Sequence, residues 1–196
     1  MGDRLRMENQ TGSVAYAVPG YETCDHPRGN IYVASSWRNI VHPSVVHALR
    51  DNDFAVYDFK NPPAGTGFAW DEIGLAHTNP IHGHPAAPDL SDRTEFLEAL
   101  THPRALAGFN SDYTAMQHAD AIIAVAPCGK SAHLELGWGA GAGKLTAILL
   151  DDPCTPELMY LAVDHCAVTI DSLLEWLDHE LPATKKRARA AESVPA

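Results

Sequence analysis

Residues 121–150 read AIIAVAPCGKSAHLELGWGAGAGKLTAILL, and this stretch decides the fold. It opens and closes on short apolar runs, AIIAVAP (121–127) and LTAILL (145–150), which predict two buried strands. The residues between them, SAHLELGWGAGAGK, predict a helix that ends at glycines, as helix C-termini often do. A strand, a helix and a strand in this order are typical of a parallel sheet covered by helices.

The same alternation continues on both sides of this stretch. The further predicted strands are IYVAS (31–35), FAVYDF (54–59) and CAVTI (166–170), and the further predicted helices are HPSVVHALRDND (42–53), about 105–118, and DSLLEWLDHEL (171–181). Right-handed crossovers between such strands favour a small flavodoxin-like doubly wound α/β domain.

Composition divides the 196 residues into three parts. Residues 1–29 are polar and rich in turn formers, and we expect a loosely held N-terminal extension. Residues 30–181 carry the alternating pattern and form one domain. Residues 182–196, PATKKRARAAESVPA, predict a basic, disordered tail.

Charge and cysteine usage exclude several function classes. The formal net charge is −11, so we expect no nucleic-acid backbone and no anionic membrane as partner. No apolar run is long enough to span a bilayer, and the first ten residues lack the apolar core of a secretory signal. The four cysteines form no CxxC pair, which favours reduced thiols in the cytoplasm. His77, His82 and His84 lack helical ligand spacing, and we expect no metal there.

A long segment rich in proline and glycine, residues 60–90, follows the second predicted strand. A connection of this length inside a compact domain is usually functional. It starts at the carboxyl edge of the sheet, where open α/β folds bind ligands, so we expect it to cover a substrate. Within it, FAWDEIG predicts a short helical turn.

Two carboxylates belong to neighbouring elements at that edge. Asp112 lies on the helix that leads into the strand at 121, and Glu135 lies one turn into the helix that follows this strand. Such a pair could perform glycoside chemistry, with one group as nucleophile and the other handling protons. The spacing alone is also compatible with acidic residues that only stabilise helices.

Anion-binding groups are predicted at the same edge. SSWRN after the first strand supplies Ser36 and Arg38, and PCGKSAH opens a helix with Lys130 and Ser131. GWGAGAGK is no P-loop, because its glycines end a helix and Leu145 stands where Ser or Thr is needed. Cys128 has no predicted base beside it, which favours a half-buried thiol over a nucleophile.

The segments IYVASSWRN, NSDYTAMQHADAIIAV and HLELGWGAGAGK resemble the nucleoside 2-deoxyribosyltransferase superfamily. The resemblance covers roughly residues 30–150 and is greatest to its nucleotide N-glycosidase branch, the deoxynucleoside 5′-monophosphate and CMP hydrolases. It implies a five-stranded parallel sheet, a homodimer and a small-molecule nucleotide or nucleoside as ligand. It implies no cofactor.

Matched to the family, Glu135 falls on the nucleophile that forms a glycosyl-enzyme intermediate. Asp112 falls on the carboxylate that assists departure of the base, and Tyr32 on the tyrosine that positions the nucleophile. Ser36 and Arg38 fall on phosphate-contacting residues.

The remaining substrate-binding residues follow the family less closely. Ser131 roughly matches another phosphate-contacting serine, although its turn is shorter here. Trp37 lies where the hydrolases keep an apolar residue near the base. The resemblance leaves the long segment at 60–90 largely unmatched. Independently of it, Phe68 and Trp70 in this segment could stack on a base and build a pocket for an incoming base.

The resemblance therefore implies hydrolysis of a nucleoside 5′-monophosphate to a free base and ribose or deoxyribose 5-phosphate. Transfer of the sugar to a second base is the first alternative, although APCGK lacks the acid with which transferases read the base. Cleavage of NAD and non-catalytic nucleotide binding are further alternatives.

Overall fold

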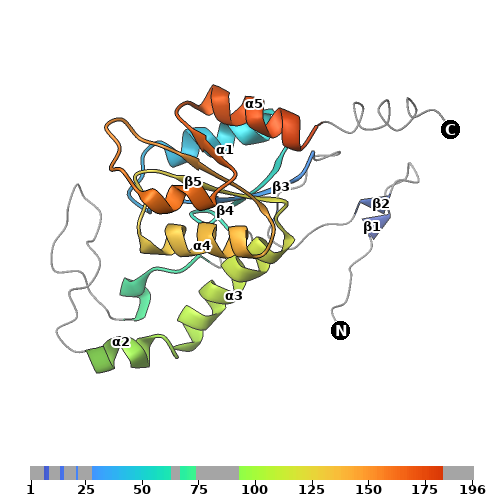
Figure 1. The fold of residues 1–196 in the computed structure, drawn as a ribbon. Helices are drawn as coiled ribbons and strands as arrows, with labels where there is room; N and C mark the ends of the chain where they lie inside the picture. Colours follow the sequence, from blue (N-terminus) through green and yellow to red (C-terminus); the bar gives the residue numbers. More distant parts are fainter. Residues whose placement is uncertain are drawn as a thin grey trace.

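The computed structural model describes residues 7–8, 14–15, 21, 28–62, 67–73 and 93–182 (Figure 1). The strands are β1 (Met7–Glu8), β2 (Val14–Ala15), β3 (Asn30–Ala34), β4 (Ala55–Asp58), β5 (Ala121–Val125), β6 (Leu145–Leu149) and β7 (His165–Ala167). The helices are α1 (His42–Asp51), α2 (Arg93–Ala99), α3 (Pro103–His118), α4 (Lys130–Gly141) and α5 (Ile170–Glu180), with 3-10 turns η2 (Trp70–Ile73) and η3 (Leu158–Ala162).

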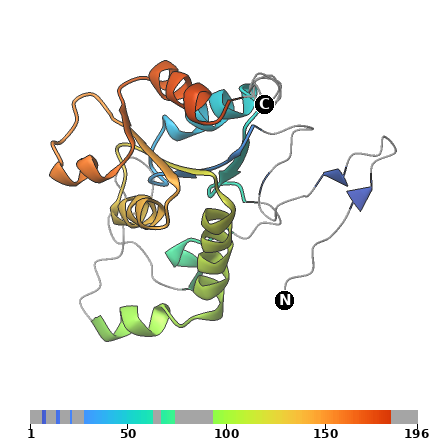
Figure 2. The ribbon, with the colours of Figure 1, turned by 45° about the vertical axis from the view of Figure 1, so that its right-hand side comes forward.

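Five parallel strands form one sheet in the order β4-β3-β5-β6-β7, which confirms the predicted doubly wound α/β fold. Helices α1 and α5 cover one face of the sheet, and α3 and α4 lie on the other (Figures 1 and 2). Because β3 and β5 are neighbours and parallel, the loops that follow them meet at one edge.

Both faces of the sheet are buried, which explains the uninterrupted apolar runs in the sequence. Ile31 and Val33 of β3 pack with α1 and α5, whereas Tyr32 and Ala34 pack on the side of α3 and α4. Gly139 allows α4 to lie close to the sheet, because a Cβ there would stand 2.8 Å from Ile122 Cδ1. Packing against the sheet therefore explains the glycine at position 139.

Several elements differ from the sequence-based expectation. The last strand, β7, is shifted toward the N-terminus of the predicted range 166–170, because Thr169 caps α5 through a capping box with Ser172. Helix α2 and the turn η3 were not predicted. The turn expected in FAWDEIG is confirmed as η2.

Some expectations lie outside the described residues. These are the placement of most of residues 1–29, of residues 74–90 with His77, His82 and His84, and of the tail after residue 182. Within the described ranges, no group of three or more His, Cys, Asp or Glu side chains could hold a metal ion, and no helix could span a membrane.

Candidate active site

Asp112 on α3 and Glu135 on α4 come together on the face of the sheet that carries Tyr32 and Tyr57. Burial raises the pKa of Asp112 to about 6, and a hydrogen bond from Tyr57 opposes the rise. Burial, followed by the negative charge of Asp112, raises the pKa of Glu135 to about 7, and a hydrogen bond from Tyr32 opposes it. The predicted carboxylates thus form an electrostatically coupled pair with elevated proton affinity.

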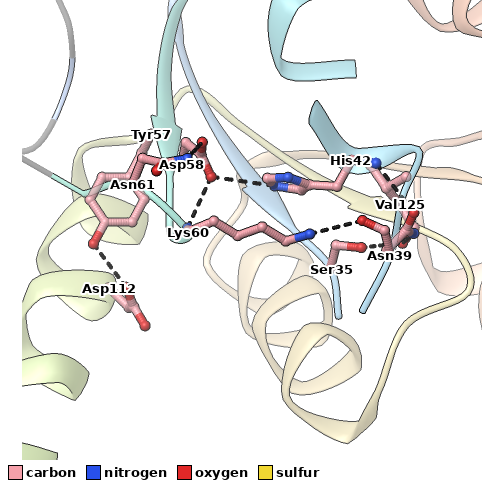
Figure 3. A network of polar contacts seen from close by, with 9 residues as sticks. All are labelled: Ser35, Asn39, His42, Tyr57, Asp58, Lys60, Asn61, Asp112 and Val125. Atoms are coloured by element: carbon pink, nitrogen blue, oxygen red, sulfur yellow. Dashed lines mark hydrogen bonds and ion pairs between the residues drawn. The ribbon is translucent and has the colours of Figure 1, made fainter. Parts of the chain in front are cut away.

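Each carboxylate of this pair is held by one tyrosine of the sheet. Tyr32 on β3 and Tyr57 on β4 are directly paired in the parallel register, and their rings stack at 5.4 Å. The Tyr57 hydroxyl donates a 2.8 Å hydrogen bond to Asp112 Oδ1 (Figure 3). The same hydroxyl lies 3.0 Å from Ser111 Oγ. Burial raises the pKa of both tyrosines, so both hydroxyls stay protonated and can donate at neutral pH.

The loop after β3 carries the predicted anion-binding residues. Ser36 is half-buried and its Oγ accepts from the Arg38 backbone N–H at 3.2 Å, while the side chains of Trp37 and Arg38 are exposed. Ser131 is exposed in the first turn of α4, whose N-cap, Gly129, offers no side chain to the free backbone N–H groups. Two loops with hydrogen-bond donors therefore flank one edge of the sheet.

Asn39, buried to 4% exposure, fixes these two loops against each other. Its Nδ2 donates to the carbonyl oxygens of Val125, at 3.0 Å, and Pro127, at 3.3 Å. Its Oδ1 accepts from the backbone N–H groups of Val41, at 2.7 Å, and His42, at 3.2 Å. One amide thus stabilises the start of α1 and holds the loop after β3 on the end of β5.

A third polar group follows β4. Asp58 is 6% exposed and accepts from the Lys60 backbone N–H at 2.9 Å and from Asn61 Nδ2 at 2.8 Å (Figure 3). Lys60 Nζ in turn donates to the Asn39 carbonyl oxygen at 2.8 Å. His42 is fully buried with Nε2 3.7 Å from Asp58 Oδ1, and burial lowers the pKa of His42 to about 4, so this histidine is neutral at pH 7.

A cavity of about 450 Å³ opens beside this network. Its lining residues are Trp37, Lys60, Asn61, Pro62, Gly67, Phe68, Ala69 and Glu72. Trp37 and Phe68, both predicted near a base, therefore share one cavity. Trp70 lies outside the lining set and packs edge-on against Phe68 with ring centroids 5.0 Å apart.

Residues 67–73, here called the strap, form one wall of the cavity and are fastened to α3. Arg104 pairs with Glu72 through Nε and Oε2 at 2.7 Å and donates from Nη2 to the Gly67 carbonyl oxygen. A Cβ on Gly108 would lie 2.5 Å from the Cβ of Phe68, so only glycine allows this approach. Asp112 lies four residues after Gly108, on the same helix face. The cavity wall is thus one helical turn from the carboxylate pair.

Two groups singled out in the sequence have structural roles. Lys144, the last residue of GWGAGAGK, donates from Nζ to the carbonyl oxygens of Gln117, at 2.8 Å, and Ala119, at 2.7 Å, at the end of α3. Burial raises the pKa of the half-buried Cys128 to about 11, assisted by the charges of Asp151 and Glu135. The thiol is protonated at neutral pH, as expected of a half-buried thiol. No base was predicted beside it, but the structure places His133 Nδ1 3.8 Å from Cys128 Sγ and 2.8 Å from the Gly129 carbonyl oxygen.

Sequence reasoning missed Asn39, Tyr57, Lys60 and Arg104. Tyr57 and Lys60 lie in YDFKN at the end of a predicted strand, which is a signal that could have been used. Asn39 and Arg104 act through contacts with distant segments, and no local pattern marks them.

No family model and no curated protein matches this chain. Among solved structures, the chain is similar to a 2-deoxyribosyltransferase from the psychrotolerant bacterium Bacillus psychrosaccharolyticus. The TM-score is 0.44 and the identity 16%, over 79% of this chain and 96% of that chain.

Proposed function

We propose that this chain hydrolyses the N-glycosidic bond of a nucleoside 5′-monophosphate. The products are a free base and ribose or deoxyribose 5-phosphate. The observation that carries the proposal is the pair Asp112 and Glu135, two coupled, half-buried carboxylates that are each bonded to a tyrosine. Most enzymes that hydrolyse glycosidic bonds use such a pair, with one carboxylate that attacks the sugar and one carboxyl that transfers the proton.

In the first step the Glu135 carboxylate attacks C1′ of the sugar, and the bond from C1′ to the base nitrogen breaks. Asp112 supplies the proton that the leaving base takes up. The glycosyl ester on Glu135 is then attacked by water, whose proton passes to Asp112. Two displacements at C1′ retain the configuration of the sugar.

The two tyrosines support different roles for the two carboxyls. Tyr32 donates to Glu135 and favours its ionised form, which the nucleophile needs. Tyr57 holds the Asp112 carboxyl on α3, one helical turn after Gly108, where the strap contacts this helix. Burial raises the pKa of both carboxyls, and the charge of Asp112 raises that of Glu135 further, so the pair still binds a proton in part of the molecules near neutral pH. Because Glu135 has the higher pKa, the resting proton favours Glu135, and the first step uses the form in which Asp112 holds the proton and Glu135 is ionised.

The phosphate is proposed to bind at the edge of the sheet, on Ser36, Arg38 and Ser131. This assignment is supported by the two loops that Asn39 fastens together and by the uncapped start of α4. The base is proposed to enter the cavity between Trp37 and Phe68, with Trp70 supporting Phe68 from behind.

The test is a panel of nucleosides, nucleoside 5′-monophosphates and NAD, scored by chromatography for released base. We expect base release from monophosphates, and a loss of several orders of magnitude in Glu135→Gln. Glu175→Gln on α5 is the matched control and should keep full activity. Excess of a different free base should yield no new nucleotide, whereas a new nucleotide as main product would assign sugar transfer instead.

A further inference from the structure

Lys60 is the cation among the residues that line the cavity, and its position bears on which bases the site accepts. We propose that Lys60 selects nucleotides whose base carries a carbonyl oxygen where others carry an amino group. The inference rests on the proposed function, since it names the substrate class of the same site.

A hydrogen bond holds the Lys60 ammonium on the loop that carries Trp37, which also lines the cavity. Its Nζ donates at 2.8 Å to the carbonyl oxygen of Asn39, two residues after Trp37, and the side chain extends from the end of β4 across to that loop (Figure 3). A lysine ammonium has three N–H groups and no acceptor. Among the described residues, Asn39 occupies one of them, which leaves donors for a ligand.

The ammonium is also partly desolvated. Burial lowers the pKa of Lys60, and the negative charge of Asp58 opposes that change. Asp58 also accepts from the Lys60 backbone N–H at 2.9 Å, so the residue is held at both its backbone and its side-chain end. A fixed, partly buried cation binds an acceptor more strongly than a solvated lysine does.

The other charged group in the lining is already engaged. Glu72 Oε1 accepts from the Ala69 backbone N–H at 2.8 Å, and Oε2 accepts from Arg104 Nε at 2.7 Å. Arg104 also neutralises its charge. The cavity therefore offers a ring two aromatic neighbours, Trp37 and Phe68, and one charged donor, Lys60. The remaining polar side chain of the lining, Asn61, donates its Nδ2 to Asp58.

A carbonyl oxygen can accept from such a donor, whereas an amino group would direct its own N–H toward it. Uracil and hypoxanthine carry this oxygen where cytosine and adenine carry an amino group. A charge-assisted hydrogen bond corresponds to about a ten- to hundredfold preference. The expected substrates are therefore oxo-base monophosphates.

The experiment compares kcat/KM for two matched pairs, uridine with cytidine monophosphate and inosine with adenosine monophosphate. The wild-type protein should favour the oxo member of each pair by about tenfold or more. Lys60→Met should reduce the preference to within about threefold, and Lys60→Arg should retain it. Lys144→Met is the matched control, because it removes another lysine bonded to backbone carbonyls, outside the cavity lining.

Two kinetic results would overturn the inference. The first is a higher kcat/KM of the wild-type protein for the amino member of each pair. The second is an equal loss of kcat/KM for both members in Lys60→Met, which would assign Lys60 to binding of the phosphate. If no monophosphate loses its base, the proposed function fails. Calorimetry with free uracil, cytosine, hypoxanthine and adenine then decides: oxo-selective binding that Lys60→Met abolishes supports the inference, and equal or absent binding refutes it.

Discussion

Tyr57 Oη donates a 2.8 Å hydrogen bond to Asp112 Oδ1 across 55 residues of sequence. The bond joins the end of β4 to the middle of α3. It fixes the direction of the Asp112 carboxyl and lowers its pKa relative to burial alone.

Tyr57→Phe should therefore raise the pKa of Asp112 above about 6. The limb of the pH–rate profile that reports this group should move to higher pH. We expect kcat/KM to fall about tenfold, because the carboxyl loses its orientation. Steady-state rates from pH 5 to 9 provide the test. A slower variant with an unmoved profile would make Tyr57 a packing residue only. Tyr32→Phe is the companion variant, and it should move the limb that belongs to Glu135.

Glu135→Gln should make the protein more stable at pH 8. The pKa of Glu135 is about 7 in the folded state, above its ordinary value of 4.5, so the folded state binds the proton more tightly than the unfolded state. The ionised carboxylate consequently destabilises the fold above pH 7, and this cost disappears as the pH falls toward 4.5. We expect a gain of roughly 1–2 kcal/mol at pH 8 that shrinks at pH 5. Denaturant unfolding at both values measures it, and an equal or lower stability at pH 8 would contradict the assigned burial.

Arg38→Ala should weaken monophosphate substrates more than the matching nucleosides. The loss for monophosphates is expected to be roughly ten- to hundredfold in kcat/KM, the size of one charge-assisted contact. Lys144→Ala is the matched control, because Lys144 precedes β6 at the opposite edge of the sheet and its Nζ bonds only to carbonyl oxygens at the end of α3 among the described residues. Equal losses for both substrate types would assign Arg38 a structural role.

Gly108→Ala should displace the strap without touching either carboxylate. The new Cβ would lie 2.5 Å from the Cβ of Phe68, so the strap must shift outward and the base loses a neighbour. We expect a raised KM, with kcat changed less. Gly137→Ala on α4 is the matched control, since a Cβ there meets nothing within 4 Å and helices favour alanine over glycine. If both variants behave alike, the strap does not contribute to binding.

The sequence predicted the elements better than their mutual contacts. Apolar runs identified every strand of the five-stranded sheet, because strands buried on both faces need continuous hydrophobic residues. Asp112 and Glu135 were found because they lie on elements that adjoin one strand. Tyr57 was not, since its bond to Asp112 depends on how α3 crosses β4. The boundary of β7 was wrong because side-chain capping by Thr169 outweighs the β-branched pattern of VTI.

The central claim is that Glu135 becomes covalently attached to the sugar. The most direct measurement is intact and peptide mass spectrometry after incubation with a 2′-fluoro-arabino nucleoside 5′-monophosphate, whose fluorine slows hydrolysis of the ester. We predict one fluorinated sugar phosphate per chain, located on Glu135, released base in equal amount, and no label on Glu135→Gln. A label on another residue, or continued release of base with no label at all, would contradict the account.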